Sequence, residues 1–235
     1  MPKNTLKPTA YQTFRIEFAP DAAGHDTDFE SVLERSRKLE DKGRFEEACN
    51  LRFNTFQELV ELIPDEGDIT LDWDDETSQA AIVLGYSSAI DLFLIADWEM
   101  CAAALEMILE LDPEDHLEAS VILAYTYIAM GEYESFDEVL NDVNDSSADK
   151  AILTLWSEER RTGRLPQGEV IRLKRNFAPY YREFIAASHP VDEAYVKDIG
   201  SEHPSKEALA RELWIQTEHL WTRFFPDFIE KLKQA

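Results

Sequence analysis

The sequence predicts a protein built almost entirely from α-helices. Only 8 of its 235 residues are glycine, whereas all-β folds use glycine in many tight turns. Alanine, leucine and glutamate, which favour helices, are abundant. Apolar residues recur at three- and four-residue steps along most of the chain, as on the buried face of a helix. With 44% hydrophobic residues, the chain can bury a sizeable core.

Residues 1–27 are the exception, and we expect an extended arm there. Phe14, Ile16 and Phe18 alternate with polar residues, which suits a short extended segment better than a helix. Pro20 and Gly24 follow and argue against extending a helix through this part.

The first two helices are expected over about 28–42 and 45–63. Asp28 is the expected N-cap of the first helix, with Ser31 as the alternative. Gly43 breaks the pattern between them. Residues 64–77 follow with seven acidic side chains and no basic one, so we expect a solvated loop. A calcium loop is disfavoured, because Thr77 stands at its turn-glycine position and Val83 where a bidentate glutamate is needed.

The same reasoning gives the remaining helices. Two histidines, His189 and His203, each precede a proline, and we expect Pro190 and Pro204 in the first turns of helices. The expected ranges are about 78–95, 98–111, 114–130, 132–141, 147–162, 169–176, 179–187, 189–199, 205–224 and 227–232.

The segment from Leu94 to His116 resembles the second half of a tetratricopeptide repeat. In that family a small turn residue and an aromatic precede a helix with small residues that closes on Leu-Asp-Pro. The corresponding residues here are Ala96, Trp98, Ala102, Ala103, Leu111, Asp112 and Pro113.

The turn recurs at Gly43, Gly131 and Gly163, where glycine can end a helix in a left-handed conformation. Gly131 lies 35 residues after Ala96 and 32 before Gly163, close to the family period of about 34. Gly43 lies 53 residues before Ala96, because the acidic loop intervenes. Phe136 replaces the usual alanine in the third pair, and the third and fourth repeats lack the closing proline, so these are diverged repeats.

The resemblance implies a fold and a function. The fold is a right-handed solenoid of helical hairpins with about three to four repeats over 28–165, closed by capping helices over 166–235. The function is that of a scaffold or adaptor, in which the first helices of the hairpins line a concave groove that binds a peptide or helix of another protein. The groove positions carried over from the family are Leu33, Arg37, Tyr86, Ile90, Phe93, Ala124, Tyr127, Leu153, Ser157 and Arg160.

That groove would be apolar and aromatic in its middle, with Arg37 and Arg160 toward its ends. We therefore expect an amphipathic helix or an extended hydrophobic peptide as ligand. Family members that bind chaperone tails hold a carboxylate with lysine and asparagine, and no asparagine occurs at these positions.

The charge is a second guide to partners. The formal net charge is −25, and residues 21–150 carry 34 acidic and 7 basic side chains. Nucleic acid and anionic lipid would be repelled, whereas a basic protein would be attracted. An acidic decoy that mimics nucleic acid is therefore an alternative function. A basic cluster over 160–182 is either an internal counter-charge or a phosphate- or RNA-binding patch.

No catalytic motif is visible. The sequence contains no glycine-rich phosphate loop and no Gly-x-Ser-x-Gly elbow, and its five histidines are not paired at ligand spacing. We expect no enzyme activity, cofactor or metal, although a site assembled only in three dimensions is an alternative.

The remaining expectations concern location and association. The N-terminus lacks the apolar core of a secretory signal, and no stretch has the roughly 18 apolar residues of a membrane span. Cys49 and Cys101 are expected as reduced, buried thiols, so we expect a cytoplasmic protein with no membrane partner. The C-terminal aromatic residues form either a core or cap, or an exposed patch for a homodimer: Trp214, Trp221, Phe224, Phe225 and Phe228.

Overall fold

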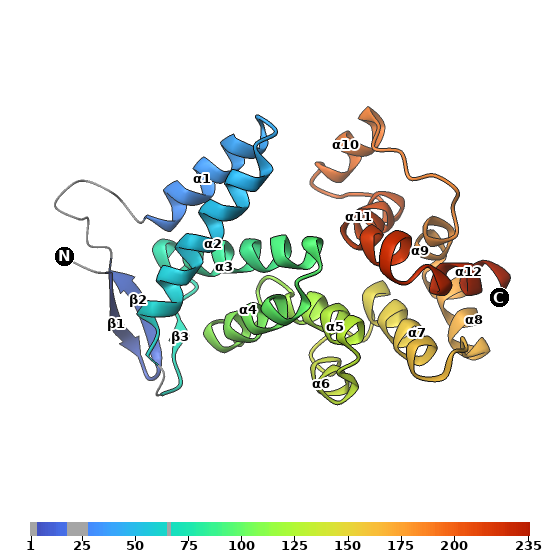
Figure 1. Cartoon of the computed structure of the whole chain (residues 1–235), viewed down its shortest axis with the longest axis horizontal. Helices are drawn as coiled ribbons and strands as arrows, with labels where there is room; N and C mark the ends of the chain where they lie inside the picture. The colour runs from blue at the N-terminus through green and yellow to red at the C-terminus, as the bar shows by residue number, and fades with distance from the viewer. Residues whose placement is uncertain (1–3, 18–27, 65–66) are drawn as a thin grey trace. The chain divides into compact units, whose positions relative to one another are not determined.

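The computed structural model describes residues 4–17, 28–64 and 67–235. These residues form twelve α-helices, one short π-helix and three short strands (Figure 1). The expectation of a mainly helical protein is confirmed, and the expectation of a purely helical one is wrong at the N-terminus. The chain divides into two compact units, unit 1 (residues 1–126) and unit 2 (residues 127–235). The predicted repeat segment, 28–165, extends across this boundary.

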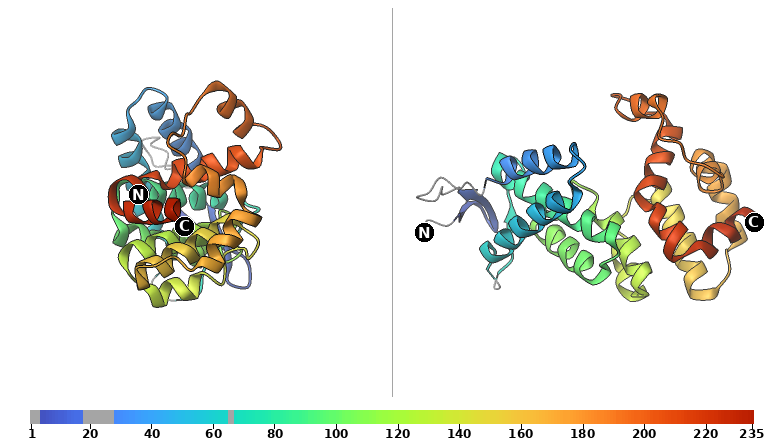
Figure 2. Two further views of the ribbon diagram at one scale, coloured as in Figure 1. Left: turned by 90° about the vertical axis from the view of Figure 1, so that its right-hand side faces the viewer. Right: turned by 45° about the horizontal axis from the view of Figure 1, so that its top comes forward.

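A small sheet forms one end of unit 1 (Figure 2). Strands β1 (Thr5–Ala10) and β2 (Thr13–Glu17) pair antiparallel, and β3 (Thr70–Leu71) pairs parallel to β2. The expected extended conformation is confirmed over 4–17, while residues 18–27 of the predicted arm lie outside the described residues. The acidic loop is not simply solvated, because its pairing with β2 places Leu71 in the core with 2% of its surface exposed.

Unit 1 is built on two helical hairpins. Helices α1 (Phe29–Glu40) and α2 (Phe45–Leu62) pack side by side, as do α3 (Glu76–Ile95) and α4 (Trp98–Leu111). Both α1 and α2 also pack against α3. Asp28 caps α1 by accepting a hydrogen bond from the backbone N–H of Glu30, as expected.

The turns that suggested the repeats have the expected backbone. Gly43, Gly131 and Gly163 have φ angles of 69°, 82° and 74°, the left-handed region in which glycine carries no steric cost. Ala96 adopts the same conformation with φ of 64° as the C-cap of α3. The backbone N–H of Asp97 donates to the carbonyl of Leu92 at 3.0 Å, which satisfies a carbonyl at the helix end.

The connection between α4 and α5 (Ala119–Met130) was predicted incorrectly. Helix α5 begins at Ala119, five residues later than expected, because Asp115 and Glu118 both have φ of 52° and cannot continue a right-handed helix. The carboxylate of Asp115 accepts hydrogen bonds from the backbone N–H groups of Ala119 at 2.6 Å and Ser120 at 3.2 Å.

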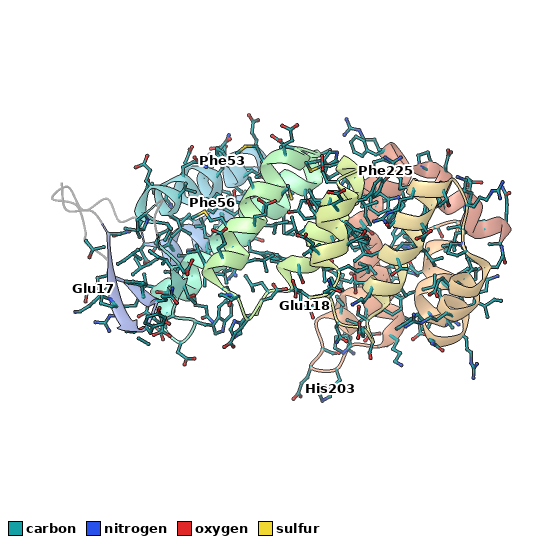
Figure 3. All side chains as sticks on the ribbon, turned by 90° about the horizontal axis from the view of Figure 1, so that it is seen from below. Glu17, Phe53, Phe56, Glu118, His203 and Phe225 are labelled. Atoms are coloured by element: carbon teal, nitrogen blue, oxygen red, sulfur yellow. The ribbon has the colours of Figure 1, made fainter. Side chains whose placement is uncertain are left out.

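Helix α3 lies close to both of its partners at Gly85. A Cβ atom added there would lie 2.5 Å from Ile108 Cδ1 and 3.0 Å from Phe56 Cε2; Phe56 is labelled on α2 in Figure 3. Because Gly85 has no side chain, α2 and α4 can both pack closely against α3 at this residue.

By length and composition alone α3 could span a membrane, and 56% of its most apolar window is buried in the structure.

Unit 2 consists of shorter helices and a π-helical turn. Helix α11 packs against α9, and α8 packs against both α7 and α9. The elements are α6 (Tyr133–Val139), α7 (Ala148–Thr162), α8 (Gln167–Asn176), α9 (Ala178–Phe184), α10 (Glu193–Ile199), α11 (Lys206–His219), η1 (Leu220–Phe224) and α12 (Pro226–Gln234).

Two details of unit 2 differ from expectation. Pro190 and Pro204 lie before the helices rather than in their first turns, because Asp192 caps α10 and Ser205 caps α11. The helix expected over 205–224 changes at His219 into the π-helical segment η1.

The C-terminal aromatic residues form mainly a core. Trp214, Trp221 and Phe228 are 4%, 2% and 0% exposed, whereas Phe224 and Phe225 are half-buried. The three buried rings are therefore not available as an exposed dimer patch.

Candidate functional site

A cleft of about 560 Å³ lies between α1 and α3 in unit 1, and we call it the α1–α3 cleft. It contains two of the predicted groove residues, Leu33 and Arg37. Its second wall comes from the N-terminal half of α3. The lining residues are Asp28, Glu30, Ser31, Leu33, Glu34, Arg37, Glu76, Gln79, Ala80 and Val83.

The cleft has an apolar floor. Leu33 and Ala80 are each 9% exposed, and Val83 is half-buried. These side chains lie at three- and four-residue steps from the other lining positions of their helices, so the inner faces of α1 and α3 form the floor. Such a surface can contact the apolar part of a peptide side chain.

The rim of the cleft is acidic. The carboxylate of Glu34 forms a 2.6 Å ion pair with Lys38 on the solvent face of α1, and this hydrogen bond lowers the pKa of Glu34. Glu30 and Glu76 are exposed in the first turns of α1 and α3. Arg37 is the single basic residue among the lining residues, so the cleft carries a net negative charge.

Most of the other predicted groove residues lie elsewhere. Phe93 is 1% exposed and packs edge-on against Trp98, with ring centroids 5.6 Å apart. Tyr86 and Ile90 are half-buried further along α3 and do not line the α1–α3 cleft. The assignment of Phe93 to a partner surface is thus corrected by its burial in the core.

In unit 2 the predicted residues are similarly divided. Leu153 and Ser157 are 0% and 3% exposed, so they belong to the interior and cannot contact a partner in this structure. Ala124, near the boundary, is also fully buried. Tyr127 is half-buried, and Arg160 is exposed with its guanidinium 4.5 Å from the ring centre of Phe225.

The sequence contained a signal for the second wall that the prediction missed. Asp75 accepts a hydrogen bond from the N–H of Ser78 and starts α3 at Glu76, within the segment expected to be a loop. Counting back from Tyr86 in helical steps then gives Val83, Gln79 and Glu76, all of which line the cleft. An Asp N-cap within the acidic run was the signal.

A buried ion network fixes the two walls of the cleft. The guanidinium of Arg52 on α2 donates to both carboxylate oxygens of Asp91 on α3 at 2.7 Å, and to Glu40 on α1 at 2.6 Å. Burial opposes the charge of Arg52, but the hydrogen bonds that it donates to Asp91 and Glu40 raise its pKa overall. Because one side chain of α2 binds both α1 and α3, it helps to set their separation.

The two cysteines are free thiols. Cys101 is fully buried, and burial raises its pKa to about 11. Cys49 is half-buried, and burial raises its pKa as well. The raised pKa values disfavour the reactive thiolate form of both cysteines, as expected of residues that serve in packing.

A second ionic cluster lies in unit 2. The guanidinium of Arg211 donates to both oxygens of Glu183 at 2.7 and 3.0 Å, and to the carbonyl of Pro190. His189 contacts Glu183 at 2.8 Å and stacks on Trp214 with ring centroids 3.9 Å apart. These contacts of Arg211 and His189 hold the segment before α10 against α9 and α11, so we assign the cluster a structural role.

The basic cluster over 160–182 is partly neutralised inside unit 2. Arg161 pairs with Asp137 at 2.6 Å, and Arg182 with Glu207 at 3.0 Å. Lys174 lies 4.9 Å from the ring centre of Tyr181. These contacts favour the interpretation of the cluster as an internal counter-charge.

Comparison with protein-family models, curated proteins and solved structures finds no match for this chain. Across the described ranges, 4–17, 28–64 and 67–235, no three His, Cys, Asp or Glu side chains lie together as a metal-binding group. We take the α1–α3 cleft as the candidate site because it contains two of the predicted groove residues, Leu33 and Arg37.

Proposed function

We propose that the protein is a non-catalytic interaction module whose α1–α3 cleft binds a segment of another protein. The observation that carries the proposal is the cleft itself, with an apolar floor at Leu33, Ala80 and Val83 and carboxylates around it. A peptide that places a lysine or arginine beside an apolar side chain matches both features. The methylene groups of the basic residue lie on the floor while its charge reaches the rim.

The resemblance to tetratricopeptide repeats supports this site. In that family the first helices of successive hairpins line the ligand groove, and α1 and α3 are the first helices of the first two hairpins here. The left-handed turns at Gly43 and Ala96 occur where the family has its turn residue. We propose a scaffold or adaptor function on this basis.

The geometry changes the expected ligand. Apolar and aromatic positions along 86–93 predicted an amphipathic helix or an extended hydrophobic peptide, but the lining of the cleft is rich in carboxylates. A basic amphipathic segment is therefore the better candidate. The acidic decoy remains the rival proposal, and it differs because its binding would depend on the whole acidic surface rather than on one cleft.

The test is a selection of random displayed peptides on the intact chain, followed by affinity measurements on the enriched peptides. The cleft variant is Glu30→Gln with Glu76→Gln. The matched control is Glu46→Gln with Glu99→Gln, because these two residues are also exposed in the first turns of helices, α2 and α4, outside the cleft. Helix-dipole effects on stability are then the same in both.

We expect enrichment of peptides with a basic residue next to an apolar one. Their affinity should fall roughly five- to tenfold in the cleft variant, as two exposed ion pairs are lost, and remain unchanged in the control. Equal losses in both variants, with release at moderate salt, would favour the decoy instead. Enrichment of peptides without basic residues would reject the proposed ligand class.

A further inference from the structure

Trp73 and His116 form a stacked aromatic pair at the opposite end of α3 from its turn with α4. Their ring centroids are 4.3 Å apart and their planes differ by 4°. Trp73 lies between β3 and α3, whereas His116 lies in the connection between α4 and α5. The stack therefore joins two segments that are more than 40 residues apart in the sequence.

His116 is held in place by a buried carboxylate. Asp112 is 4% exposed, and it accepts hydrogen bonds from the backbone N–H of His116 at 2.9 Å and from its Nδ1 at 2.7 Å. Glu114 lies 3.5 Å from Nε2, and Asp74 approaches from the segment that carries Trp73. All three charged groups that face the imidazole are thus acidic.

A cleft of about 640 Å³ in unit 1 is lined by residues close in sequence to both members of the pair. One wall contains Ile69 and Thr70, which lead to Trp73. The opposite wall contains Met107, Leu111 and Pro113, which lead to His116. Separation of the two rings would remove a contact that links these walls.

We propose that Trp73 and His116 are a proton-sensitive clasp that holds the segment 67–75 against the end of α4. When His116 is protonated, its positive ring lies on the face of the indole and attracts it. When the proton is lost this attraction disappears, and the segment 67–75 opens more often. The clasp would thereby make the mobility of the segment 67–75, which lines this cleft at Ile69 and Thr70, depend on pH.

The sign follows from the surroundings of His116. The hydrogen bond to Asp112 raises the pKa of His116 most; burial opposes it, and the charges of Asp112, Glu114 and Asp74 add to the rise, so the net shift is upward. A raised pKa means that the folded state binds the proton more tightly than the unfolded state does. The stabilisation is fully present below the pKa of the unfolded chain and is lost as the pH rises through that of the folded state.

The test combines a titration with hydrogen exchange on the intact chain. NMR follows the imidazole of His116 and the indole N–H of Trp73 through the pH range. Exchange is measured at the amides of Thr70 and Asp72, which donate to Gln12 and Phe14 of the sheet. His116→Gln keeps a donor for Asp112 but cannot take up a proton.

Comparison of wild type with His116→Gln at the same pH cancels the intrinsic exchange rate. We expect wild type to be about two- to fivefold more protected at about pH 6, the size of an exposed cation–π contact. The ratio should be smaller at about pH 9, where the neutral imidazole keeps its stacking contact with Trp73 but has lost its positive charge. The Trp73 indole signal should shift with the same midpoint as His116.

The matched control is His203→Gln, at the tip of the loop between α10 and α11 (Figure 3), which should leave the Thr70 and Asp72 amides unchanged at both pH values. A Trp73 signal that does not follow the His116 titration would overturn the clasp. So would a protection ratio that is the same at both pH values.

Discussion

Both units are mainly helical, but different kinds of side chain fill their interiors. Unit 1 places small residues where its helices cross, and Gly85 brings α3 into contact with Phe56 and Ile108. Its fully buried small residues include Ala48, Ala81, Ala89 and Cys101. Unit 2 fills its interior with aromatic rings. The ring centroid of Trp156 lies 4.9 Å from that of Trp221 and 5.3 Å from that of Phe225, and the centroids of Trp221 and Phe228 are 5.1 Å apart.

Their charges differ as well. Residues 1–126 carry 28 acidic and 9 basic side chains, whereas residues 127–235 carry 20 and 14. Unit 1 buries one of its few cations, Arg52, between two carboxylates. Unit 2 buries an anion, Glu183, beside Arg211. Unit 1 thus packs its helical hairpins through small residues and around a buried cation, whereas unit 2 packs around buried aromatic rings and a buried anion.

The largest effect should come from the aromatic core. Trp221→Ala removes a ring that is 2% exposed and contacts Trp156, Phe184 and Phe228. We expect unit 2 to lose about 3–5 kcal/mol of unfolding free energy, because a cavity replaces the indole. Hydrogen exchange with mass spectrometry on the intact chain resolves the change by segment.

The control is Trp98→Ala in unit 1, where the indole is only half-buried. Its loss of protection should be smaller and confined to segments of residues 1–126. If Trp221→Ala lowered protection equally in both units, they would not be separately stabilised, and the comparison between them would fail.

The next effect concerns the buried cation of unit 1. Arg52→Ala leaves the carboxylate of Asp91, which is 17% exposed, without its bidentate partner. We expect a loss of about 2–3 kcal/mol, at the lower end for a buried pair because Glu40 is partly exposed. Urea unfolding monitored by hydrogen exchange should show the loss over α1, α2 and α3.

Arg44→Ala is the matched substitution on the same helical hairpin. Arg44 pairs with Glu47 at the surface, where both side chains are about half exposed, so its removal should change stability little. Similar effects of the two substitutions would show that the buried network of Arg52 does not hold α1 and α3 together.

Sequence reasoning was most successful where one residue determines the local backbone. The turns at Gly43, Gly131 and Gly163 were predicted with their left-handed conformation, because glycine adopts it without steric cost. Ala96 was predicted only as a turn residue, and it adopts the same conformation. The boundaries of α4 were predicted to the residue. Helix α5 was extended too far, because the strained conformation of Asp115 and Glu118 depends on hydrogen bonds that no periodic pattern reveals.

Prediction was weaker for long-range pairing and for the candidate site. The strand at 70–71 is two residues long, and its pairing with β2 bridges more than 50 residues, so local sequence carries no signal for it. Leu33 and Arg37, which were predicted to face a groove, line the α1–α3 cleft. Phe93, Leu153 and Ser157 are buried, because a helical face that suits a groove also suits a core.

The smallest effect tests the close approach at Gly85. In Gly85→Ala the new methyl group would lie 2.5 Å from Ile108 Cδ1 and 3.0 Å from the ring of Phe56. The Ile108 side chain must shift to remove this close contact, and such overpacking destabilises a core by about 1–3 kcal/mol. The better helix propensity of alanine stabilises the variant by up to about 1 kcal/mol. We expect a net loss of about 1 kcal/mol in unit 1.

Ile108→Val removes the Cδ1 atom that the new methyl group meets, so the double variant Gly85→Ala with Ile108→Val decides the cause. If the contact is responsible, the loss in the double variant is smaller than the sum of the two single losses, and the difference is the coupling energy. Additive losses, measured by denaturant unfolding, would place the cost elsewhere in α3. Additive losses would also show that a methyl group fits at position 85 without displacing α4. The helices of unit 1 would then not depend on a small residue at this position for their close packing.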